Sequence, residues 1–210
     1  VEVAWVLAGM GCVLRQRAWW AALFFTLAVL TKETSVLAVD GVGAAYVLGQ
    51  RKVIAPQTFV IPGLVLVGWQ VYLFQHWGQW PVTGSGADLG WPLAEFVALA
   101  GRAVGIGAAF SRRTLLEVIF IVMIAVAPLI MLRASRTHLP IKIAWVLYGL
   151  LVLTFSAPLW AEDIAYFRAL VDFYLWGMLI VMGVPSRWRW PVLLASLAMW
   201  AYSFSWTLNL

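Results

Sequence analysis

The stretch AVLTKETSVLAV, residues 28–39, places a lysine next to a glutamate between two apolar runs. Apolar residues dominate the flanking stretches 18–31 and 35–49. Runs of this kind form buried or lipid-facing helices, and the short polar TKET segment between them indicates a turn. Charged side chains in such surroundings usually have a partner or a task. The stretch therefore predicts a helical hairpin with Lys32 and Glu33 at its tip.

The composition of the 210-residue chain is typical of membrane proteins, since 64% of the residues are hydrophobic and only 11% are charged. The mean hydropathy is +0.92, whereas soluble domains carry about 25% charged residues. We therefore predict an all-α polytopic transmembrane helix bundle, with a single membrane domain over 1–210. The net charge of +5 comes from scattered cations, so no nucleic-acid partner is expected. The single Cys12 excludes an internal disulfide.

Charged, proline and glycine residues divide the chain into apolar runs. A helix needs about 20 residues to cross a hydrocarbon core of about 30 Å. Eight runs approach that length, and we predict a spanning helix in each: 1–14, 18–31, 35–49, 58–76, 115–132, 141–157, 164–184 and 191–208. The first run ends at Leu14 and residue 1 is not methionine. We therefore expect the natural N-terminus to lie upstream of Val1.

A further apolar stretch, 92–110, is not counted as a span. Glu95 lies near its start and Arg102 at its middle, which disfavours crossing. Counting it would also remove most of the asymmetry of Lys and Arg between the two sides. We predict an interfacial or re-entrant helix here, within one long outer loop over 77–113 that is rich in glycine and tryptophan.

The positions of Lys and Arg orient the predicted helices, because short cytoplasmic loops are enriched in both. If loop 15–17 is cytoplasmic, so are 50–53, 133–142 and 185–190. These loops hold nine of the 14 cations: Arg15, Arg17, Arg51, Lys52, Arg133, Arg136, Lys142, Arg187 and Arg189. All Asp and Glu residues map to the opposite side or to the outer halves of helices. We therefore expect the chemistry to face outward.

The TKET turn is a candidate anion site. The runs on either side of it would form helices of only about 21 and 22 Å, so the turn is expected below the headgroups. Thr34 or Ser35 is expected to cap the second helix, whose free N–H groups would then bind an anion beside Lys32. Asp40 follows Glu33 by seven residues and falls on nearly the same face. Alternatively, Lys32 only snorkels and Glu33 only ends a helix.

A second candidate site lies in PLWAEDIAYFRALVDFY, residues 158–174. Glu162 and Asp163 are expected at the outer mouth of the following helix. Arg168 and Asp172 are four residues apart, a spacing that allows a structural ion pair. The functional alternative is that Arg168 binds phosphate, for which a guanidinium group is well shaped.

The outer loop contains QHWGQWPVTGSGADLGW, residues 75–91, with His76, three tryptophans and Asp88. The tryptophans fit an interfacial belt. They also fit a loop that covers a substrate and stacks on sugar rings, with His76 in a supporting role. No metal site is expected, because no second histidine falls on this side.

Two residues receive structural interpretations. Thr114 and Glu117 match the spacing of a capping box at a helix N-terminus. His138 falls in a predicted cytoplasmic loop and is expected to be solvated. P-loop, HExxH, GxSxG and CxxC motifs do not occur in the sequence, which excludes common soluble chemistries.

Two stretches resemble a known family. LTKET is similar to the LTK-G-P or L-[RK]-E-T turn of GT-C-type membrane glycosyltransferases, which include the dolichyl-phosphate-mannose mannosyltransferases and bacterial relatives that build cell-surface glycopolymers. YFRALVDFYL resembles the late RY-x-x-P element of that family, with Asp172 near the place of its proline. The resemblance covers the whole chain in topology but only these two stretches in motif.

The resemblance implies transfer of a sugar from a polyprenyl-phosphate donor to an acceptor on the outer face of a bacterial inner membrane. Lys32 and Arg168 would hold the donor phosphate, while Glu33 would orient the lysine or bind sugar. Membrane lipid and the polyprenyl-phosphate sugar would be partners, and a divalent cation is left open as a cofactor. The general base of the family is an aspartate in the first outer loop, which no residue here matches. We therefore expect this chain to work with an upstream part of the same protein.

Two other classes of function remain open. A transporter or flippase for a lipid-linked or anionic substrate also carries charges within spans. A non-catalytic membrane subunit is the third reading. Transporters often show repeated halves with a site at the midplane, whereas this sequence has no visible repeat and its charges gather toward one side.

Overall fold

The computed structural model describes residues 1–49, 55–78, 80, 89–105, 112–156, 160 and 163–208, with the backbone alone for 163–169 and 203–208. Helices make up nearly all of the regular structure in these ranges, and no strand is longer than a single bridge between Leu89 and Phe155. The helices are α1 (Glu2–Leu14), α2 (Ala18–Thr31), α3 (Ser35–Leu48), α4 (Gln57–Trp77), α6 (Ala94–Ala103), α7 (Arg112–Met131), α8 (Leu139–Leu153), α10 (Asp163–Met182) and α11 (Arg189–Leu208).

The helices occupy the apolar runs expected from the sequence, with ends that differ by a few residues. The stretch 92–110 also forms a helix, α6, but a shorter one than expected. Two helices, α4 and α7, are long and apolar enough to cross a membrane, whereas α1, α2, α3 and α8 are apolar but shorter. Only 22% of the most apolar window of α4 and 28% of that of α7 are buried. Their apolar surface thus faces mainly outward, unlike that of a core helix in a soluble protein.

The chain divides into two compact units. Unit 1 comprises Val1–Ala87 and His138–Tyr148, and unit 2 comprises Asp88–Thr137 and Gly149–Leu210. Each unit is described by itself.

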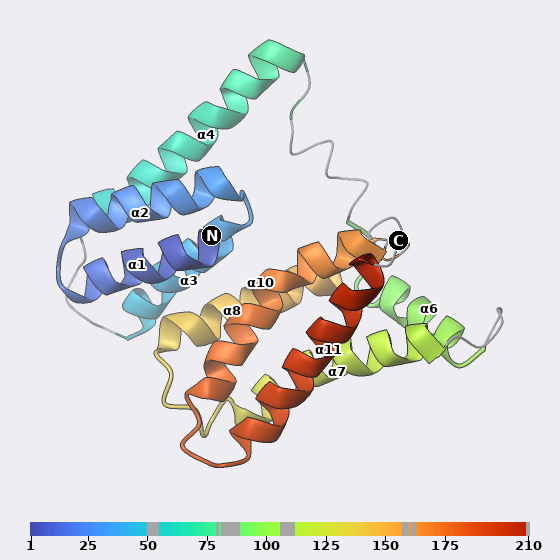
Figure 1. Ribbon diagram of the computed structural model, residues 1–210. Helices are drawn as coiled ribbons and strands as arrows, with labels where there is room; N and C mark the ends of the chain where they lie inside the picture. Colours follow the sequence, from blue (N-terminus) through green and yellow to red (C-terminus); the bar gives the residue numbers. More distant parts are fainter. Residues whose placement is uncertain are drawn as a thin grey trace. The chain divides into compact units, whose positions relative to one another are not determined.

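In unit 1, α1 and α2 pack as a hairpin and α4 lies along α2 (Figure 1). Gly9 lets α1 approach the ring of Phe25 so closely that any added side chain there would overlap it. Phe25 in turn stacks on Phe59 of α4, with 6.1 Å between ring centroids. The Phe25–Phe59 contact therefore sets where the start of α4 lies along the length of α2.

Helices α3 and α8 run antiparallel within unit 1. The Tyr148 hydroxyl donates to the Thr34 carbonyl, just before α3, at 2.9 Å. Further along, Gly41 lies so close to Ala144 that an added Cβ would be 3.0 Å from its backbone nitrogen. The last turn of α3 and His138, just before α8, then line one pocket. Helix ends that the sequence assigns to one side of a membrane therefore meet at one end of this unit.

In unit 2, α7 packs on α6 and α10, and α11 packs on α10 and α7. Phe120 of α7, Tyr174 of α10 and Trp200 of α11 meet at centroid distances of 5.3 to 6.1 Å. A short connection also joins α6 to the end of α8, because Leu93 N–H donates to the Leu153 carbonyl at 2.8 Å.

The capping-box interpretation of Glu117 was wrong. Thr114 lies inside α7 instead of before its first turn. The buried Glu117 carboxylate accepts a hydrogen bond from Arg113 Nε at 3.0 Å. The residue has a structural role, as expected, but as half of an i,i+4 ion pair.

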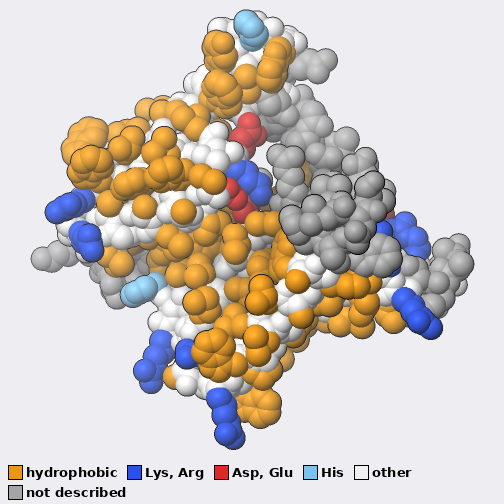
Figure 2. All heavy atoms as spheres, in the orientation of Figure 1, with side chains coloured by type: hydrophobic (Ala, Val, Ile, Leu, Met, Phe, Trp, Pro, Cys, Tyr) orange, Lys and Arg blue, Asp and Glu red, His pale blue; other side chains and the backbone are white. Residues whose placement is uncertain are grey.

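Large apolar side chains cover much of the drawn surface of the protein (Figure 2). Exposed examples occur on most helices: Trp19, Leu30, Val47, Leu64, Val67, Val97, Ile130, Leu150, Leu194 and Leu197. Exposed apolar surface on this scale marks a surface that meets lipid or another protein.

Candidate functional site

The TKET turn begins where Lys32 leaves the helical conformation. Thr31 ends α2, and its hydroxyl donates to the Leu27 carbonyl at 2.6 Å. Lys32 N–H still bonds the Ala28 carbonyl at 3.0 Å, but its φ of −155° and ψ of 120° are those of extended backbone. The chain therefore turns at Lys32, and its half-buried side chain lies at the tip of the hairpin.

The expected side-chain cap on α3 is absent among the described residues. Thr34, the N-cap residue, has helical angles and makes no capping hydrogen bond through its side chain. The N–H groups of Ser35, Val36 and Leu37 donate to the carbonyls three residues earlier, at 2.9 to 3.1 Å. These amides are occupied, so the prediction that they bind an anion was wrong. Any anion at this turn must be held by side chains.

The Glu33 side chain bonds a residue far along the chain. Gln70 Nε2 donates to Glu33 Oε1 at 2.7 Å, and Gln70 itself is only 9% exposed in α4. Helix α4 continues from Gln70 to Trp77, roughly 10 Å at the rise of an α-helix. Since α2 and α4 run in the same direction, α4 extends beyond the turn (Figure 1). The turn therefore lies below the end of the neighbouring helix.

Three buried polar atoms at this turn have no hydrogen-bond partner in the described part of the chain. They are Thr34 Oγ1, Ser35 Oγ and Gln70 Oε1. An ionised carboxylate only accepts hydrogen bonds, so the Gln70 amide presents its NH₂ group to Glu33. The amide oxygen of Gln70 then points away from Glu33 and makes no hydrogen bond in the described part of the chain. Buried polar groups normally find a partner in protein, water or ligand. The turn thus combines a cation, a carboxylate, two hydroxyls and an amide oxygen.

Two other predicted residues belong to unit 1. Asp40 is exposed on α3, and its supporting role stays a prediction. His76 stacks on Tyr72, which stacks on Trp69, at centroid distances of 5.7 and 5.6 Å. This exposed aromatic row follows a different face of α4 from Gln70.

The second predicted site belongs to unit 2 and is described only in part. Asp172 is fully buried in α10. Arg168 and Asp163 lie in α10, but their side chains are outside the described residues, as are Glu162 and the outer-loop Asp88 altogether. The Arg168–Asp172 pair and the phosphate role of Arg168 stay predictions.

Sequence reasoning missed Gln70 and Tyr148. Both are polar side chains inside otherwise apolar runs, and this is the signal that could have found them. The Gln70 amide holds Glu33, while the Tyr148 hydroxyl holds the backbone of Thr34. No cluster of three metal-binding side chains occurs among the described residues.

The chain was compared with protein-family models, curated proteins and solved structures, and none of them matches it.

Proposed function

We propose that this chain is a polytopic membrane protein of eight spanning helices that serves the transfer of a sugar from a polyprenyl-phosphate donor. In this proposal the loops 15–17, 50–53, 133–142 and 185–190 face the cytoplasm. The TKET turn faces outward and receives the phosphate and first sugar of the donor.

The hydrogen bond between Gln70 and Glu33 is the observation that carries the proposal. It holds a charged turn beside α4 at a point short of the end of that helix. Polar backbone at such a depth in a membrane is found only where protein or a watery cavity covers it. A recessed polar site that opens toward one face suits a donor whose lipid tail stays in the bilayer while its sugar reacts above.

The side chains of the turn fit the two polar parts of such a donor. Sugar hydroxyls can donate hydrogen bonds, and the exposed Glu33 carboxylate is suited to accept them. The Lys32 ammonium is suited to the phosphate. In transfer, the acceptor oxygen bonds to the anomeric carbon while the bond from that carbon to the phosphate oxygen breaks. The proton of the acceptor hydroxyl passes to a general base, which is not assigned to a residue of this chain. The carrier phosphate leaves with the electron pair, and a nearby cation stabilises the charge that develops.

Substitution of Lys32 tests the proposal in the full-length protein that contains this chain. The protein is reconstituted in vesicles with a polyprenyl phosphate, and binding is compared for wild type, Lys32→Gln and the control Lys142→Gln. We expect Lys32→Gln to weaken binding about 10- to 100-fold, because a hydrogen bond to a charged group contributes about 1.5–3 kcal/mol. The control should bind like wild type.

Equal binding by all three proteins would overturn the phosphate site. Inorganic phosphate in place of the lipid distinguishes the source of the anion, since the proposal expects it to compete weakly. Sugar transfer is measured in the same vesicles. If the lipid moves between leaflets but no sugar is transferred, the result would favour the flippase function over the transferase function.

A further inference from the structure

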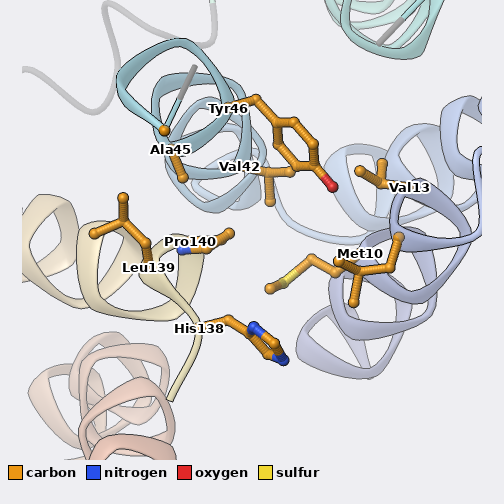
Figure 3. Close-up of a pocket in the computed structure, with 10 residues that line it drawn as sticks. Met10, Val13, Val42, Ala45, Tyr46, His138, Leu139 and Pro140 are labelled. Atoms are coloured by element: carbon orange, nitrogen blue, oxygen red, sulfur yellow. The ribbon is translucent and has the colours of Figure 1, made fainter. Parts of the chain in front are cut away.

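A pocket of about 230 Å³ lies in unit 1 at the opposite end of α3 from the TKET turn (Figure 3). It is formed by the last turns of α1 and α3 and by the start of α8. The first α3 residue that lines the pocket is Val42, whereas the turn ends at Ser35, so at least roughly 10 Å separate the two sites along the helix axis. The pocket therefore belongs to a different site.

The pocket has apolar walls with two polar groups. Met10 and Val13 come from α1, and Val42 and Ala45 come from α3. The Tyr46 hydroxyl is directed toward the side of α1 that carries Val13, and the His138 ring lies across from it beside Met10 (Figure 3). Pockets for drug-sized ligands measure about 300–1,000 Å³. This smaller pocket suits a segment of a flexible apolar chain.

Two arginines follow the wall of the pocket. Leu14 lines the pocket, and the exposed Arg15 and Arg17 come after it at the end of α1. No Asp or Glu is among the described residues that line the pocket. The apolar walls could contact acyl chains and the two arginines could contact anionic headgroups, because acyl chains lie directly below the headgroups in a membrane leaflet.

We propose that this pocket binds the upper part of an acyl chain of an anionic phospholipid, close to its glycerol, while the headgroup phosphate contacts the Arg15–Arg17 loop. The site rests on the membrane location of the chain but not on sugar transfer or on Lys32. Carboxylates in the wall would oppose an acyl chain, and none is found among the described residues that line the pocket. A neutral apolar solute would gain nothing from the arginines, which is why an anionic lipid fits better.

A photoreactive lipid tests this site in nanodiscs that contain the full chain. Phosphatidylglycerol with a photoreactive group in the upper part of one acyl chain is crosslinked, and the labelled peptides are identified by mass spectrometry. We expect labels on peptides that contain Met10, Val42 or His138. Ala45→Phe should reduce this labelling at least five-fold, because the ring fills the pocket. Val47→Phe is the matched control, since Val47 is 80% exposed on the same helix and does not line the pocket.

Arg15→Gln separates headgroup binding from pocket filling and changes only an exposed side chain. It should remove most of the preference for phosphatidylglycerol over a phosphatidylcholine probe of the same design. Labels spread over the exposed helix faces, or unaffected by Ala45→Phe, would overturn the acyl-chain site. An unchanged lipid preference in Arg15→Gln would overturn the anionic headgroup. Lys32→Gln should leave the labelling unchanged, so this result and the test of the TKET turn can fail separately.

Discussion

Gly41 shows how a single residue sets the distance between two helices. An added Cβ there would lie 3.0 Å from the backbone nitrogen of Ala144 and 3.3 Å from its Cα. Backbone atoms cannot rotate away as a side chain can, so α3 and α8 would have to separate. Separation would also strain the Tyr148–Thr34 hydrogen bond that holds the TKET turn.

We expect Gly41→Ala to destabilise the protein. Alanine favours helix by about 1 kcal/mol over glycine, but overpacking a close contact costs about 1–3 kcal/mol. Gly11→Ala is the control, because nothing lies within 4 Å of its added Cβ. Thermal unfolding in detergent, followed by tryptophan fluorescence, should give Gly41→Ala the lower Tm of the two. Equal Tm values would contradict the close approach of α3 and α8.

At the same scale, the sequence predicted which residues are unusual better than what they contact. Lys32 and Glu33 stand out because charge is rare in an apolar run. The partner of Glu33 lies 37 positions away, and no local pattern encodes a pairing at that distance. The N–H groups of α3 were mispredicted for a local reason: a tight turn with three-residue hydrogen bonds competes with side-chain capping.

Among the elements, the end of α10 is held by the segment that precedes α8. Ser135 Oγ donates to the Ile180 carbonyl at 2.7 Å, and Thr137 Oγ1 donates to the Leu179 carbonyl at 3.2 Å. Arg136 N–H donates to the Gly183 carbonyl at 2.9 Å. The last carbonyls of a helix have no partner inside it. Gly183 N–H reaches both the Leu179 and Ile180 carbonyls, at 3.1 and 3.2 Å, so the two hydroxyls give these carbonyls a second donor each.

Ser135→Ala should loosen this helix end. Without the Ser135 hydroxyl, the Ile180 carbonyl keeps only the bond from Gly183 N–H at 3.2 Å, and the loss of one hydrogen bond costs about 0.5–1.5 kcal/mol. Ser186→Ala is the control, because the Ser186 hydroxyl accepts only a 3.3 Å bond from Trp188 N–H. Hydrogen exchange should show faster exchange of amides at the end of α10 in Ser135→Ala alone. Identical exchange rates in both variants would mean that the Ser135 hydrogen bond does not stabilise the end of α10.

The positions of helices were easier to predict than their ends. Apolar runs bounded by charged residues or proline indicate where a helix can lie, and each of the eight runs contains one. Glu117 shows the limit: T-x-x-E is also compatible with a helix that starts earlier, at Arg112, where Arg113 competes for the carboxylate. Local patterns cannot rank such alternatives, because their energies differ by only about 1 kcal/mol.

For the whole molecule, the exposed apolar surface is the property that most constrains its environment. The outward faces of α4 and α7 are long and apolar enough to contact lipid, and the other helices add to this apolar surface. The proposed topology then decides which loops meet each aqueous compartment.

Cysteine labelling in intact cells tests that topology. In a Cys12→Ser background, Trp91→Cys places a thiol at a residue that is 84% exposed in the predicted outer loop. Arg136→Cys places one at an exposed residue of a predicted cytoplasmic loop. We expect a membrane-impermeant maleimide to label the first in intact cells and the second only after permeabilisation. The reverse pattern would invert the orientation and move the TKET turn to the cytoplasmic side.

The difference in length between the α2–α3 hairpin and α4 also has an electrical consequence. In the proposed topology, an anion that travels from the outer surface to the turn would cross up to about a third of a hydrocarbon core of about 30 Å. A full crossing changes the energy of one charge by about 2.3 kcal/mol per 100 mV, so this part amounts to up to about 0.8 kcal/mol. With the cell interior negative, an energised membrane would weaken anion binding at Lys32 and favour release of the spent carrier. Occupancy of the turn should then fall as the voltage rises.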